Sequence, residues 1–182
     1  MPHTAELLKE KRDDGRAEVP RRILFVCTGN TCRSPMAAAL LNHMARAREI
    51  CSACADAEGV SIVATSAGLY AREGDPITPA AADALAEAGV PCTAQNDYRA
   101  HRARCVSAEM IKEADEVIAI TGRHAMELML RFPEYAARIG TLPLDIPDPF
   151  GGDEKAYRSC LDMLSYAIGL KWCAGDNVDE NS

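Results

Sequence analysis

A cysteine and an arginine stand near the two ends of a short loop early in the chain. Residues 27–34 read Cys-Thr-Gly-Asn-Thr-Cys-Arg-Ser, so five residues separate Cys27 from Arg33. A loop whose backbone N–H groups point inward binds an oxyanion, and an arginine fork grips two of the oxygens. The same positive field stabilises a thiolate, which makes Cys27 a nucleophile. The residue types predict covalent chemistry on a phosphate-like group.

The flanking segments predict that this loop joins a strand to a helix. The preceding residues 23–26 are apolar and rich in strand formers. Gly29 and Asn30 tolerate left-handed backbone conformations. Ser34 is predicted as the N-cap of the helix and Pro35 as its first residue. This context disfavours the simpler interpretation of a buried strand cysteine and an unrelated surface arginine.

A phosphocysteine route also needs a group that protonates the leaving atom and later activates water. Residues 144–152 offer two carboxyls, Asp145 and Asp148. Asp148 lies between two prolines, which restrict the backbone and would hold its carboxylate over a pocket. Phe150 could wall that pocket. Residue chemistry prefers Asp148 and leaves Asp145 as its competitor.

Short apolar runs alternate with helical patterns along the rest of the chain. Further strands are predicted at 61–65, 116–120 and 138–142, and helices at 35–49, 79–88, 108–114, 122–132 and 153–172. The second, third and fourth of these helices are each preceded by a predicted N-cap: Thr78, Ser107 and Thr121. This alternation predicts an α/β fold whose parallel sheet is covered on both faces. Ligands bind beyond the carboxyl ends of such strands, and the loop of Cys27 follows such an end.

Length and composition limit the class of protein. The chain has 182 residues, 48% of them hydrophobic and 26% charged, which fits one globular domain. A net charge of −7 argues against nucleic acid or an anionic membrane as a partner. Residues 1–20 are charged, so they do not form a secretory signal, and no apolar run could span a bilayer. We expect a cytoplasmic protein with an extension at 1–20, a domain at 21–175 and a tail at 176–182.

Several motifs in one order resemble the low-molecular-weight protein tyrosine phosphatase family. The resemblance spans roughly residues 21–172 and rests on the loop 27–34, Ser66-Ala67-Gly68, His101 with Ala103-Arg104, Ala114-Asp115 and Asp148-Pro149-Phe150. It implies a three-layer fold with a four-stranded parallel sheet and helices on both faces. No metal or organic cofactor is expected, because Arg33, the loop amides and a helix terminus supply the positive charge.

The resemblance also implies a role for each site residue. Cys27 would be the nucleophile, Arg33 the phosphate clamp and Asp148 the general acid and then the base. Ser34 would donate a hydrogen bond to the sulfur. Asn30, in a left-handed conformation, would be held by Ser34 and by two supporting residues, Ser66 and His101. The phosphate-binding residues would be Thr28, Gly29, Asn30, Thr31, Cys32 and Ser34.

Within that family the chain most resembles the bacterial protein arginine phosphatases. Thr31 stands where tyrosine phosphatases usually carry a bulkier aliphatic residue, and the ending at 148–152 is similar to that branch. The implied substrate is a protein carrying phosphoarginine, whose planar cation could lie between Tyr70 and Phe150. A phosphotyrosine phosphatase of the same mechanism remains the main alternative. It is weakened by Gly151, which removes a second aromatic residue from the pocket.

The remaining cysteines suggest further possibilities. Cys32 could form a reversible disulfide with Cys27 that protects the nucleophile from over-oxidation. Cys51 and Cys54 have metal-ligand spacing without further ligands nearby, so they are interpreted as surface or packing residues.

Two other functions remain open. A thiol-coupled arsenate reductase would need two relay cysteines, for which Cys92 and Cys105 are the candidates. Their spacing and the presence of Asp148 argue against it. A non-catalytic phospho-ligand binding module would not need both Cys27 and Asp148.

Overall fold

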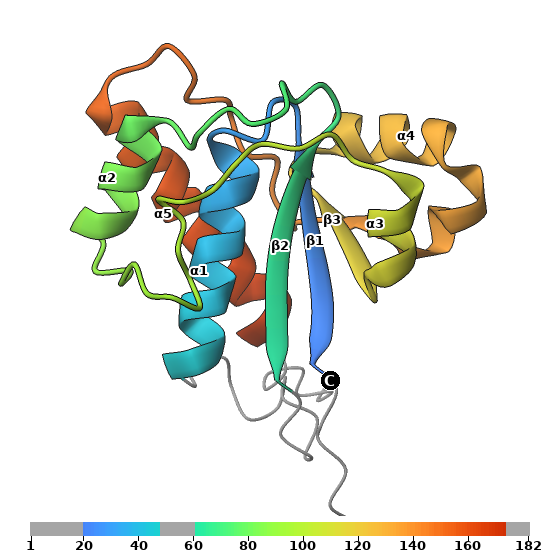
Figure 1. The fold of residues 1–182 in the computed structure, drawn as a ribbon, viewed down its shortest axis with the longest axis horizontal. Coiled ribbons are helices and arrows are strands. Elements are labelled where there is room, and N and C mark those ends of the chain that lie inside the picture. The colour runs from blue at the N-terminus through green and yellow to red at the C-terminus, as the bar shows by residue number, and fades with distance from the viewer. Residues whose placement is uncertain (1–19, 48–60, 174–182) are drawn as a thin grey trace, which may run out of the picture.

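The computed structural model describes residues 20–47 and 61–173, which contain one parallel sheet of four strands (Figure 1). The strands are β1 (Arg21–Cys27), β2 (Ile62–Gly68), β3 (Glu116–Ala119) and β4 (Ile139–Thr141), in the spatial order β2-β1-β3-β4. In the register of β1 and β2, Cys27 lies opposite Gly68. The sheet confirms the predicted α/β fold.

Helices cover both faces of this sheet and make three layers (Figure 1). Three helices pack on one face of the sheet: α1 (Arg33–Ala47), α2 (Pro79–Glu87) and α5 (Glu154–Cys173). The helices α3 (Ala108–Glu113) and α4 (Gly122–Arg131), with the 3-10 helix η1 (Pro133–Arg138), lie on the other side. Helices on both faces are what parallel connections require.

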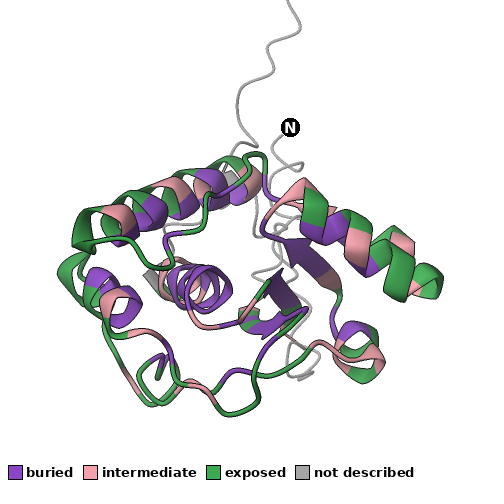
Figure 2. Ribbon diagram, turned by 90° about the horizontal axis from the view of Figure 1, so that it is seen from above, coloured by how far each residue is buried: buried purple, intermediate pink, exposed green. Residues whose placement is uncertain are grey.

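The core lies on both sides of β1, because alternate side chains of a strand point to opposite faces. Ile23 and Phe25 join the core under α1 and α5, whereas Leu24 and Val26 join the core under α3 and α4. Figure 2 shows that the sides of the helices turned toward the sheet are buried and their outer sides exposed. The predicted apolar stripe of α5 is buried at every position: Tyr157, Leu161, Leu164, Ile168 and Trp172.

This topology places Cys27 where the order of the strands reverses. β1 lies between β2 and β3, so the chain leaves β1 toward one neighbour and later returns to the other. Ligand sites of open parallel sheets lie at such a reversal, beyond the carboxyl ends of the strands. The loop at 28–32 stands at that edge, between β1 and α1.

The structure corrects three expectations about local structure. The second strand does not end at residue 65 but continues to Gly68, where it still pairs with β1. Ser34 is not an N-cap, because α1 begins one residue earlier, at Arg33. Thr78 precedes Pro79 of α2 as expected, but its side chain makes no capping hydrogen bond.

Some expectations lie outside the described residues. These are the extension up to residue 19, the loop at 51–59 with Cys51 and Cys54, and the tail at 176–182. Among the helices that the structure describes, none is long and apolar enough to cross a membrane.

Candidate active site

The Cys27 sulfur lies at the base of the loop, where it meets two polar groups. The side chain is 2% exposed. The backbone N–H of Asn30 donates to the sulfur at 3.4 Å, and Ser34 Oγ lies 3.0 Å from it. Ser34 Oγ also lies 3.1 Å from the carbonyl oxygen of Ala67, to which it donates. Because the single Ser34 proton goes to Ala67, Ser34 can accept a hydrogen bond from the Cys27 thiol but cannot also donate one to it, as was expected. The donor directed at the sulfur is the backbone N–H of Asn30.

Asn30 organises the loop from within. It is the only non-glycine residue of the described chain with a positive φ, at 56°, and it is fully buried. Its Nδ2 donates to Ser34 Oγ at 3.0 Å and to Ser66 Oγ at 2.9 Å, and its Oδ1 accepts from the N–H of Arg104 at 3.0 Å. His101 Nε2 lies 2.7 Å from the Asn30 carbonyl oxygen. The left-handed conformation is therefore held from four sides.

His101 donates to that carbonyl oxygen as a neutral side chain. Burial lowers the pKa of His101, although its hydrogen bond with Asn30 works in the opposite direction. Since a carbonyl oxygen can only accept, the imidazole proton must reside on Nε2.

The end of β2 packs closely behind the loop. A Cβ atom at Gly68 would stand 2.7 Å from the carbonyl oxygen of Thr28, so this approach requires glycine. The N–H groups that follow Gly68 donate to the loop: Leu69 to the Cys27 carbonyl and Tyr70 to the Thr28 carbonyl, both at 2.9 Å. These hydrogen bonds fix the start of the loop against the end of β2.

Arg33 is buried, with 6% of its surface exposed. Its Nη1 donates to the carbonyl oxygen of Ile146 at 3.2 Å. Its Nη2 donates to Asp148 Oδ2 at 2.6 Å and to Thr28 Oγ1 at 3.4 Å. A guanidinium held on a carbonyl and a hydroxyl can exchange the carboxylate for an incoming anion.

The structure separates the two carboxyl candidates. Asp145 Oδ1 accepts from the N–H of Gly122 at 2.8 Å, so it serves the start of α4. Asp148 bonds the guanidinium of Arg33, and its side chain is half exposed. Of the two carboxyls, Asp148 is therefore the one in contact with the arginine of the loop.

The expected walls of the substrate pocket are solvent-exposed. Tyr70 is 63% and Phe150 73% exposed. The hydroxyl of Tyr70 donates to Glu127, which also pairs with Arg131, and the Arg131 guanidinium stacks 4.5 Å from the Tyr70 ring centre. Thr31 is half-buried within the loop. Tyr70 is thus a fixed platform, and the sandwich of a substrate between it and Phe150 stays a prediction.

Cys32 is buried against α2 and α5. Its sulfur lies 3.4 Å from Thr78 Oγ1 and 3.6 Å from the Tyr157 hydroxyl. Burial, helped by the contact with Cys32, raises the pKa of Tyr157 to about 12. Thr78 thus uses its hydroxyl on this sulfur, which explains why it does not cap α2. Cys27 and Cys32 are both free thiols in this structure.

Cys92 and Cys105 are held by other groups. The Cys92 thiol donates to Asp97 Oδ1 at 3.3 Å, and the Cys105 thiol donates to the Ala71 carbonyl at 3.0 Å. Among the described residues, no cluster of three or more His, Cys, Asp or Glu side chains could hold a metal ion.

Sequence reasoning missed one residue of the site, His124. It lies in the first turn of α4, 7% exposed, with Nε2 2.9 Å from Thr28 Oγ1 and Nδ1 2.8 Å from Thr121 Oγ1. Thr121 was predicted as the cap of this helix, and its oxygen accepts from the His124 N–H. A polar residue three positions after an N-cap commonly reaches back to it, and that spacing was the available signal.

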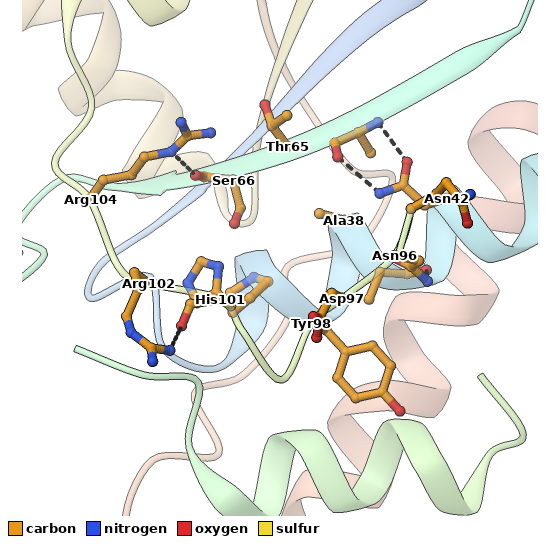
Figure 3. Close-up of a pocket in the computed structure, with 14 residues that line it drawn as sticks. Ala38, Asn42, Thr65, Ser66, Asn96, Asp97, Tyr98, His101, Arg102 and Arg104 are labelled. Atoms are coloured by element: carbon orange, nitrogen blue, oxygen red, sulfur yellow. Dashed lines mark hydrogen bonds between the residues drawn. The ribbon is translucent and has the colours of Figure 1, made fainter. Parts of the chain in front are cut away.

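A cavity of about 280 Å³ opens between α1, β2 and the segment at 95–104 (Figure 3). Ser66, His101 and Arg104 line it, and Arg104 Nε donates to the Ser66 carbonyl at 3.1 Å. Asn42 lines the same cavity and bonds both backbone groups of Ala64 on the edge strand β2. Neither Cys27 nor Asp148 lines this cavity. Its lining residues Ser66, His101 and Arg104 instead bond Asn30 of the loop.

Comparison with known proteins agrees with this geometry. A family model for low molecular weight phosphotyrosine protein phosphatases matches residues 22–170. The protein-arginine-phosphatase of Geobacillus stearothermophilus is 39% identical over 157 residues, which cover 82% of this chain and 93% of that protein. The low molecular weight protein-tyrosine-phosphatase PtpB of Staphylococcus haemolyticus is 30% identical over 158 residues, covering 81% of this chain and 95% of its own.

One solved structure bears on the nucleophile. It is a mutant of the YwlE arginine phosphatase in which serine replaces a cysteine and the active-site serine is phosphorylated. It matches the chain with a TM-score of 0.65 and 33% identity, and the match covers 82% of this chain and 95% of that one.

Proposed function

Since the chain belongs to the low molecular weight phosphotyrosine protein phosphatase family, we propose that it hydrolyses phosphoarginine in proteins through a phosphocysteine intermediate. The observation that carries the reaction is the convergence of Cys27, Arg33 and Asp148 at one edge of the sheet, with Arg33 bonded to Asp148 at 2.6 Å. The 39% identical arginine phosphatase supports the substrate, and the phosphorylated serine of the YwlE mutant supports a covalent intermediate at position 27.

In the first step the Cys27 thiolate attacks phosphorus and the P–N bond breaks. The departing guanidine nitrogen takes a proton from Asp148, and the phosphoryl group stays on the sulfur. Arg33 and the backbone N–H groups of the loop bind the phosphoryl oxygens while charge builds on them. For Arg33 to do so, the phosphoryl group must replace Asp148 as its partner.

In the second step water attacks the phosphocysteine. The Asp148 carboxylate takes the proton of that water, the P–S bond breaks, and inorganic phosphate leaves with the thiolate restored. Neither step consumes an external oxidant or reductant. The chain's own groups supply every charge and proton that the two steps use.

The proposal is tested by comparing a phosphoarginine protein with a phosphotyrosine peptide as substrates of the reduced enzyme, with the Cys27→Ser variant as blank. Preference for phosphoarginine would support it. Preference for phosphotyrosine would keep the mechanism and replace the substrate. Turnover of neither would overturn the proposal and direct attention to arsenate reduction or to a binding role.

We propose that Thr31 determines the preference for phosphoarginine over phosphotyrosine. Its hydroxyl and small size suit a guanidinium, whereas a larger aliphatic residue would favour an aromatic ring. Thr31→Ile is expected to shift the ratio of phosphoarginine to phosphotyrosine turnover about tenfold toward phosphotyrosine, the scale of such pocket changes. The ratio of kcat/KM values measures this. Thr65→Ile, the same change at an exposed position of β2, is the control, and an unchanged ratio in Thr31→Ile would refute the assignment.

We also propose that Cys32 protects the nucleophile. Peroxide oxidises the Cys27 thiolate to a sulfenic acid, and the Cys32 thiol then attacks that sulfur, forming a disulfide and releasing water. Both cysteines are buried and lie five residues apart in the sequence, at the two ends of the same loop.

Peroxide followed by thiol is expected to restore the wild-type enzyme and to leave Cys32→Ser inactive. Residual activity after each treatment measures this. Cys160→Ser is the control: burial raises the pKa of Cys160 to about 12, so this thiol stays protonated and unreactive. Full recovery of Cys32→Ser would contradict the role. Such a thiol system would operate in a reducing compartment, so we propose the cytoplasm as the location.

A further inference from the structure

We propose that His124 is a positioning residue that orients the phosphate clamp through Thr28. The inference deepens the proposed phosphoryl chemistry and rests on it. Four side chains form a continuous chain of contacts from α1 to α4: Arg33 Nη2 to Thr28 Oγ1 at 3.4 Å, Thr28 Oγ1 to His124 Nε2 at 2.9 Å, and His124 Nδ1 to Thr121 Oγ1 at 2.8 Å.

The direction of each hydrogen bond follows from the donors. Arg33 can only donate, so Thr28 Oγ1 accepts from it and has its own proton to give to His124 Nε2. The imidazole proton then lies on Nδ1, where it donates to Thr121. Thr121 also accepts from the N–H of His124 at 3.4 Å, so the end of this chain is attached to the first turn of α4.

The contact with Thr28 matters most after substrate has bound. In this structure Arg33 is held by Asp148, by the Ile146 carbonyl and by Thr28. Once a phosphoryl group takes the place of Asp148, only the carbonyl and the Thr28 hydroxyl remain of these three. His124 fixes the rotamer of Thr28, so it decides whether the guanidinium keeps its plane while it binds the phosphoryl oxygens.

The arrangement requires a neutral imidazole. An added proton on Nε2 would prevent it from accepting from Thr28 and would face Arg33 with a second cation. The charged groups near the ring are Arg33 of α1, Asp148 of the loop before α5, and Arg123 and Glu127 of α4. Burial lowers the pKa of His124 and Arg33 lowers it further, so the neutral form prevails at pH 7.

The test is a double-mutant cycle on kcat/KM with p-nitrophenyl phosphate, so its result does not depend on phosphoarginine being the substrate. His124→Ala and Thr28→Val are each expected to lower kcat/KM about tenfold, the scale of a hydrogen bond to a charged group. Because they interrupt one chain, the double variant should be no worse than either single one. His124→Gln, whose amide reaches the position of Nε2, should restore most of the activity.

Ser107→Ala is the matched control, because Ser107 caps α3 through the N–H of Met110 and does not contact the loop residues named above. It should lower the melting temperature and leave kcat unchanged. If His124→Ala behaves like this control, or if the double variant loses about a hundredfold, the proposal is wrong.

The pH profile gives an independent reading. Burial lowers the pKa of His124 below its ordinary value of 6.5. As the pH falls through this lowered pKa, protonation of His124 should depress wild-type kcat/KM. His124→Gln cannot titrate and should keep its activity to lower pH. Superimposable acid limbs in the two enzymes would overturn the role of the neutral ring.

Discussion

Cys27→Ser is expected to lose turnover on the order of a millionfold, the loss seen when a catalytic nucleophile is removed. A serine hydroxyl is not ionised at neutral pH, so it is a far weaker nucleophile than a cysteine sulfur. Steady-state release of phosphate measures the loss. The variant should remain folded, because the side chain at this position is small and the loop is held by Asn30 and not by the sulfur.

The fate of the phosphoryl group makes this result specific. A serine at the same place should accept the group slowly and keep it, as the YwlE mutant with a phosphorylated serine illustrates. Intact-mass measurement after incubation with a phosphoarginine protein should find one added phosphoryl group. Cys92→Ser, which changes an exposed thiol, should turn over like the wild type. If Cys27→Ser turned over substrate as fast as the wild type, a phosphocysteine intermediate would be excluded.

Most of the fold could be predicted because its signals are local. Buried strands read as short apolar runs, and α5 repeats its apolar residues at helical spacing, so each could be assigned from its own sequence. Ser107 and Thr121 cap their helices as predicted, because each side-chain oxygen accepts a hydrogen bond from an otherwise unpaired N–H of the first turn. The carboxyl-edge position of the loop then followed from the alternation of strands and helices.

The errors arose where a side chain has a partner far away in the sequence. Ser34 and Thr78 both precede a proline and so look like helix caps. Ser34 instead bonds Cys27, Asn30 and Ala67, and Thr78 turns to Cys32. A local rule cannot weigh a tertiary hydrogen bond that satisfies the same hydroxyl.

His124 was missed for a related reason. The spacing of His124 from the N-cap Thr121 predicts at most a contact within the first turn of α4, and it does not point to the loop at 28–32. Its importance depends on Thr28, which is 96 residues away and meets it only because β1 and β3 are adjacent in the sheet. Contacts such as Thr28 to His124, between residues that follow adjacent strands of the sheet, are the part of the site that needed the structure.

Arg33 and Asp148 share a hydrogen bond of 2.6 Å, with the guanidinium buried and the carboxylate half exposed. In the mechanism that we propose, a phosphoryl group has to compete with Asp148 for Arg33. Its binding would release Asp148 toward the leaving group, so the acid would be freed only when a group that needs it has arrived.

Asp148→Asn is expected to lower kcat for a phosphoarginine protein roughly a thousandfold, within the range for loss of general acid catalysis. The guanidine nitrogen leaves poorly without a proton, and an amide cannot supply one. With p-nitrophenyl phosphate, whose leaving group is a stable anion, the loss should be only about tenfold. Measuring kcat with both substrates separates proton donation from damage to the loop, since damage would lower both values alike.

Asp145→Asn is the matched control, because it makes the same change three residues away in a side chain that bonds the N–H of Gly122. An amide oxygen can still accept that bond, so kcat should stay within about twofold of the wild type for both substrates. Equal losses of Asp148→Asn on both substrates would remove the role of general acid from Asp148. A larger loss in Asp145→Asn than in Asp148→Asn would transfer that role to its neighbour, because the two carboxyls differ chiefly in which one faces Arg33.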